Sequence, residues 1–190
     1  MVSAEVERAV YRELVDWSSS ILAKPSPHFK GLPPCPYARQ AWVEGNVAVL
    51  FKHESNKQGL YNTISHFDDN FELAIIVDFK FEEDPEVFHT YLDELNDVIS
   101  DGMFIDKDIW VMGFHPHDEE SDFVQDVDFE PHIDAEYAMI FVQRLSKLQG
   151  AADKLDKKGY YDIYNSQYNA REIYDKREKL YRTLKNGDET

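Results

Sequence analysis

Short apolar runs that alternate with helical patterns constrain the fold of this chain more than any other feature. The run LAIIVDF at 73–79 is apolar almost throughout, which is typical of a strand covered on both faces. A β-branched run, VAVLF at 47–51, precedes it, and the apolar spacing at 56–68 between them predicts a helix. Strand, helix and strand in this order indicate a βαβ unit with two parallel strands.

The same alternation continues towards the C-terminus. Asp84 and Pro85 predict the start of a helix that ends at Gly102, because aspartate caps a first turn and proline suits the first helical position. Two more strands are predicted at 108–115 and 137–143, and further helices at 3–22, 35–42, 144–158 and 168–186.

These elements predict one α/β (α+β) domain over residues 1–190, with a helical C-terminal extension from about 144. Its centre would be a ferredoxin-like or other small βαβ-based sheet of about four strands covered by helices. A small doubly wound sheet is the alternative.

Net charge excludes two classes of partner. The chain has 20 Lys and Arg against 37 Asp and Glu, a formal charge of −17, and such a surface repels both nucleic acid and anionic membranes. It has no apolar run long enough to cross a bilayer and no signal-peptide pattern. Its single cysteine cannot form an internal disulfide, and we therefore expect a cytoplasmic protein.

The charge is also uneven along the chain, since residues 108–143 contain no Lys or Arg. A stretch of this kind can bind a cation or a basic protein partner, and it can equally be a solvated acidic loop. Both interpretations stay open.

The single cysteine, Cys35, is the first candidate for chemistry. It lies in LPPCPYA just before a predicted short helix, where free N–H groups favour a thiolate, and Arg39 adds positive charge. We therefore consider Cys35 a candidate catalytic residue, with a small buried side chain in a turn as the alternative. Ala38 occupies the position of the second cysteine in a CPYC motif, and no strand precedes the segment, which excludes a thioredoxin fold.

The second candidate is the segment FHPHDEESDF at 114–123, which follows a predicted strand, where ligands often bind. His115 and His117 can face one ion, and Asp118 supplies an oxygen, a set that suits divalent Zn, Mn or Fe. Alternatively, both imidazoles bond to loop backbone. Residues elsewhere that can supply a further ligand are His28, Asp78, His132 and Asp134.

A third pattern, DVDFEPHID at 126–134, alternates acidic residues as calcium loops do. Counted from Asp126, however, an EF-hand needs Gly and Glu where this chain has Pro131 and Tyr137, which excludes that motif. A looser Ca²⁺ or Mg²⁺ site stays open. The chain also lacks the glycine-rich, P-loop, GxSxG, HExxH and CxxC motifs.

Two of these segments together resemble a bacterial family of unknown function, number 1415. LPPCPYARQAWVEGNVAVLF is similar to its LCPFA segment and following strand, and VMGFHPHDEESDF is similar to its strand ending in FHP. The resemblance implies a common fold and a shared Cys/His site, and its motifs match Cys35, Pro36, Phe114, His115 and Pro116. The family's Arg-Ser-Pro-Tyr-Pro run is absent here. The KPSPHF…PPCPYA opening also resembles uncharacterised proteins of marine tailed phages, which would place the chain in the host cytoplasm.

Two functions follow as hypotheses. In the first, Cys35 and His115 share a pocket that performs thiol chemistry on a small-molecule ligand, or that binds a divalent metal through His115, His117 and Asp118. In the second, the chain is a non-catalytic acidic protein that binds a basic protein partner.

Overall fold

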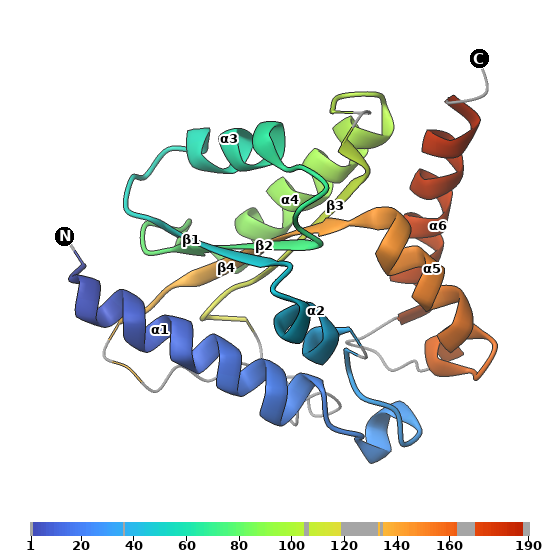
Figure 1. Ribbon diagram of the computed structural model, residues 1–190. Coiled ribbons are helices and arrows are strands. Elements are labelled where there is room, and N and C mark those ends of the chain that lie inside the picture. Colours follow the sequence, from blue (N-terminus) through green and yellow to red (C-terminus); the bar gives the residue numbers. More distant parts are fainter. Residues whose placement is uncertain are drawn as a thin grey trace.

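A mixed four-stranded sheet lies between two layers of helices in the computed structural model (Figure 1). The structure describes residues 2–35, 37–104, 107–118, 133, 135–162 and 170–187. The strands are β1 (Val47–Lys52), β2 (Leu73–Asp78), β3 (Ile109–Phe114) and β4 (Ala138–Arg144). The helices are α1 (Ala4–Trp17), α2 (Ala38–Glu44), α3 (Gln58–His66), α4 (Pro85–Ser100), α5 (Leu145–Asp156) and α6 (Ala170–Gly187). Shorter turns are η1 (Ser18–Leu22), η2 (Pro27–Phe29) and η5 (Tyr160–Asp162).

The strand order is β1-β2-β4-β3, which combines two kinds of βαβ unit. β1 and β2 are adjacent and parallel, and α3 connects them. α4 connects β2 to β3, but β4 enters between these two strands and runs antiparallel to both. The α/β class and the sheet of four strands are thus confirmed. The unit in which β4 separates β2 from β3 is the split βαβ unit of ferredoxin-like folds. The adjacent parallel pair of β1 and β2 is the arrangement found in a doubly wound sheet.

Alternate residues of β2 serve two cores, as the apolar run predicts for a strand buried on both faces. Ala74 and Ile76 pack against α3, α4 and α6, and Ile75 and Val77 pack against α1. Figure 1 shows α3 and α4 on one side of the sheet and α1 and α2 on the other. β1, β2 and β3 run in the same direction between these layers, so their carboxyl ends lie at one edge of the sheet.

The α4 helix forms as its capping residues predict. The Asp84 carboxylate accepts hydrogen bonds from the N–H groups of Glu86 and Val87, at 2.9 and 3.1 Å. The buried Asn96 side chain of the same helix reaches the free edge of β3. It donates to the Val111 carbonyl at 2.7 Å and accepts from the Val111 N–H at 3.0 Å, which binds α4 to β3.

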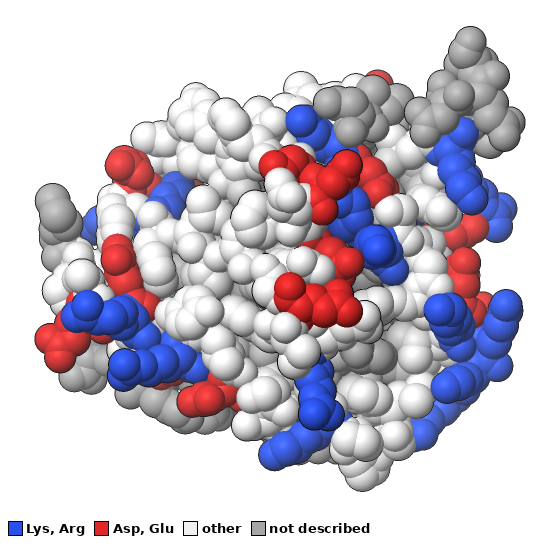
Figure 2. Space-filling model, viewed as in Figure 1, with Lys and Arg blue, Asp and Glu red and all other residues white. Residues whose placement is uncertain are grey.

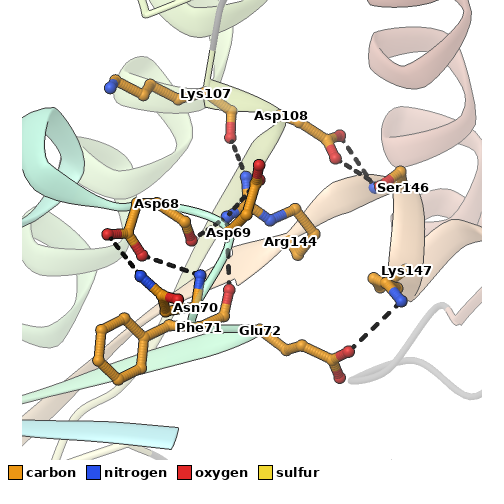
Figure 3. A network of polar contacts seen from close by, with 10 residues as sticks. All are labelled: Asp68, Asp69, Asn70, Phe71, Glu72, Lys107, Asp108, Arg144, Ser146 and Lys147. Atoms are coloured by element: carbon orange, nitrogen blue, oxygen red, sulfur yellow. Dashed lines mark hydrogen bonds and ion pairs between the residues drawn. The ribbon is translucent and has the colours of Figure 1, made fainter. Parts of the chain in front are cut away.

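Arg144, the last residue of β4, holds together the opposite edge of the sheet, where the parallel strands begin (Figure 3). Its guanidinium donates to the carbonyl oxygens of Lys107, at 2.8 Å, and of Asp68. Next to it, Asp108 accepts from the Ser146 N–H at 3.0 Å, at the start of α5. These bonds bring three chain segments together with every named group partnered, so this edge is structural.

Candidate functional site

Polar and titratable side chains gather at the carboxyl edge of the parallel strands. β1 and β2 end at Lys52 and Asp78, and His115 follows the end of β3. His89, in the first turns of α4, also belongs to this edge, because it contacts the turn after β3. Ligands of α/β sheets commonly bind at this edge, which makes it the candidate functional site.

His115 is a buried residue whose two ring nitrogens are both used by the main chain. Nε2 donates to the Glu82 carbonyl at 2.7 Å, and Nδ1 accepts from the His117 N–H at 3.0 Å. The ring is 5% exposed and lies against Phe81 and Phe88, with centroids 5.0 and 5.4 Å away. With both ring nitrogens bonded to the main chain, His115 positions the turn.

Asp118 and His89 form the accessible polar pair of this edge. One Asp118 oxygen accepts from the His115 N–H at 2.8 Å, and the other lies 2.7 Å from Nε2 of His89. Partial burial raises the pKa of Asp118, but the bonds from His89 and from the His115 N–H outweigh it and hold that pKa below its usual value. Both side chains are partly solvent-exposed, at 42% for His89 and 36% for Asp118.

His117 completes the cluster on the outer side of the turn. Its Nε2 lies 3.6 Å from Glu136, just before β4, and both side chains are exposed. The structure therefore brings His115, His117 and Asp118 together, as their spacing predicts, and gives each a different environment.

The predicted metal site stays a prediction. Within the described parts of the chain, no three His, Cys, Asp or Glu side chains are arranged to hold a metal ion. Of the further ligands considered, Asp78 is bound to Lys52, whose Nζ lies 2.9 and 2.8 Å from its two oxygens. His132, Asp134 and the side chain of His28 lie outside the described residues, as does most of the acidic stretch, including 126–132.

Cys35 lies in other surroundings. Its N–H donates to the Leu22 carbonyl at 2.9 Å, and the preceding residue, Pro34, accepts from the Tyr160 hydroxyl of η5. Burial raises the pKa of the Cys35 thiol, although the N–H groups of Tyr37 and Ala38 and the charge of Arg177 act in the opposite direction. The thiol is therefore protonated at neutral pH.

The pocket that Cys35 and His115 were predicted to share stays a prediction, and the described contacts of the two residues come from different elements. The neighbours of Cys35 come from η1, η5 and α6, whereas those of His115 come from the turn before α4, from α4 and from its own turn. Among the described contacts, none joins the two residues. Pro36, which the family resemblance matches, is not described.

Sequence reasoning missed His89, Arg177 and the Lys52–Asp78 pair. The pair had a usable signal, because each residue closes an apolar strand and adjacent parallel strands place equivalent positions side by side. His89 and Arg177 had no such signal, since neither the His89–Asp118 pair nor the Arg177–Tyr161 pair follows from a strand register.

Comparisons of this chain with family models, with curated proteins and with solved structures found no match. The resemblance to the family of unknown function thus stays a prediction. No described helix is both long and apolar enough to span a membrane.

Proposed function

We propose that this protein binds a small polar ligand at the carboxyl edge of its sheet and exchanges a proton with it through His89. The observation that carries the proposal is the 2.7 Å contact between Nε2 of His89 and Asp118, whose other oxygen is held by the His115 N–H. The role of His115 is then to position the carboxylate.

The chemistry follows from this arrangement. A carboxylate that accepts from one imidazole nitrogen fixes the proton there and leaves the other nitrogen as an acceptor. Nδ1 of His89 has no hydrogen bond to any described residue, and the ring is partly exposed, so a ligand can reach it. Through this nitrogen, His89 can accept a proton from a bound ligand and return it.

A ligand screen with matched variants tests the proposal. Small polar metabolites are screened for a rise in melting temperature of the native protein, and each hit is repeated with His89→Asn, Asp118→Asn and the control Asp93→Asn. Asp93 is an exposed acidic residue on the same helix. We expect the effect to be lost in the first two variants and kept in the control. Hits that all persist in His89→Asn would contradict the proposal.

Charge favours a second function, in which the chain binds a basic protein partner. The support is the net charge of −17 and the absence of Lys and Arg from 108–143. On the face drawn in Figure 2, acidic and basic side chains are interspersed, so the excess acid is not gathered there. A polylysine peptide should then bind with an affinity that falls steeply with salt, and salt-independent binding or none would count against this function.

A further inference from the structure

Arg177 on α6 is a buried charge that forms no ion pair with any residue that the structure describes. The side chain is 7% exposed, and Nη2 donates to the Tyr161 hydroxyl at 3.0 Å. Its Nε is fully buried and has no hydrogen-bond partner. In the part of the chain that the structure describes, no acidic side chain forms an ion pair with Arg177.

This situation is costly, and the guanidinium cannot avoid it by losing its proton. Burying an ion without a partner carries a large desolvation penalty, and Arg stays charged at all physiological pH values. Buried arginines are therefore normally paired with a carboxylate or another anion.

The carboxylate that acts on Tyr161 is Asp156, and it is paired with Arg171 at 2.7 Å. The other titratable groups around Arg177 are neutral at physiological pH. Burial raises the pKa of Tyr37 to about 12 and also raises that of Tyr161. The Cys35 thiol is likewise protonated, because burial raises its pKa. Among the described residues, Arg177 therefore has no carboxylate paired with it.

The fold holds these groups next to one another. The Tyr160 hydroxyl donates to the Pro34 carbonyl, which sets the chain before Cys35 against η5, and Tyr161 follows in η5. The Tyr37 hydroxyl donates to the Lys147 carbonyl of α5 at 3.3 Å. Because the Tyr161 oxygen accepts from Arg177, its own O–H remains able to donate. Arg177 Nε and the Tyr161 hydroxyl thus offer two donors beside one buried charge.

We propose that Arg177 and Tyr161, with Cys35 beside them, form a binding site for a small oxyanion, the chemistry that phosphate and carboxylate groups share. The site uses none of the residues assigned above to the carboxyl edge of the sheet. An oxyanion would neutralise the guanidinium and accept hydrogen bonds from both donors.

Alkylation of the native protein provides the first test. Cys35 is the only cysteine, so the rate of its reaction with iodoacetamide reports on this site alone. Sodium phosphate and sodium acetate are compared with sodium chloride at equal ionic strength. An anion bound beside the thiol should slow the reaction with a saturating dependence, roughly tenfold at ten times its dissociation constant. If the rate saturates with phosphate, the site binds phosphate groups, and if it saturates with acetate, the site binds carboxylates. Alkylation rates equal to those in chloride in both series would overturn the proposal.

Matched variants provide the second test. Arg177→Met should lose the saturating increase in melting temperature that the anion gives, whereas Arg182→Met, which removes an exposed arginine of the same helix, should keep it. If Arg177→Met does not fold, the Nε–H resonance of Arg177 is followed in the native protein by NMR. It should shift and saturate with the same anion. A resonance that does not move, or a Met variant that still responds, would refute the site.

Discussion

His115 shows how a residue of chemical promise can have a structural role. Its side chain is 5% exposed and joins the Glu82 carbonyl to the His117 N–H, whereas the neighbouring His117 is exposed. We expect His115→Ala to lower the free energy of unfolding by about 1–3 kcal/mol, because the buried ring is removed and two main-chain groups lose their partner. His117→Ala serves as the control and should change it by less than about 0.5 kcal/mol. Urea unfolding measures both, and equal effects would contradict this interpretation.

The pKa of Asp118 gives a second prediction for a single residue. A carboxyl whose pKa is lower in the folded than in the unfolded state stabilises the fold above the unfolded pKa, near 3.9, and loses this effect as pH falls through the folded pKa. The difference in unfolding free energy between the native protein and Asp118→Asn should be fully present at about pH 5 and shrink below about pH 4. A difference that grows towards acid pH would contradict the bonds assigned to Asp118.

For single residues, the sequence predicts which side chains lie close together better than it predicts what each side chain does. His115, His117 and Asp118 lie in one turn, as their spacing requires, but only tertiary contacts decide that His115 faces a carbonyl and Asp118 faces His89. The positive charge near Cys35 was expected from Arg39 and is exerted by Arg177 on the last helix. Such partners come from chain segments that no local pattern connects.

Among the elements, β3 and α4 pack unusually closely at Gly113. A Cβ atom at this position would lie 2.6 Å from both Leu92 and Phe88. We expect Gly113→Ala to destabilise the protein by about 1–3 kcal/mol, because the strand or the Phe88 ring must move. Gly150→Ala on α5 is the matched control, since a Cβ there meets nothing within 4 Å. It should stabilise by about 0.5–1 kcal/mol through helix propensity. Thermal unfolding of both variants measures this, and a neutral Gly113→Ala would refute the close contact.

The helices and strands could be predicted from the sequence because local patterns of residues determine each of them. Apolar alternation and capping residues mark α4 and the strands. The observed bounds of β2 and β3 fall within the predicted ranges, and β1 extends one residue beyond its range, to Lys52. The place of β4 between β2 and β3 was not accessible, because strand pairing depends on contacts between distant segments. For the same reason, the sequence could not tell which polar side chains would meet at one edge of the sheet.

The excess of negative charge acts on the molecule as a whole. With a net charge of −17, like charges repel one another in the compact state more than in the unfolded chain. Raising NaCl from about 10 to about 150 mM shortens the screening length from roughly 30 to 8 Å, and we expect the melting temperature to rise by a few degrees. Calorimetry measures this change, with KCl as a control for ion-specific effects. A melting temperature that falls with added salt would show that attractive ion pairs outweigh the repulsion.

The position of β4 has a consequence for the order in which this molecule can assemble. The strand that fills the gap between β2 and β3 is the last of the four to leave the ribosome, so the earlier strands wait with inward-facing backbone groups uncovered. Any nascent or cleaved product that stops before Ala138 therefore carries two open edges and is a candidate for chaperone binding or aggregation.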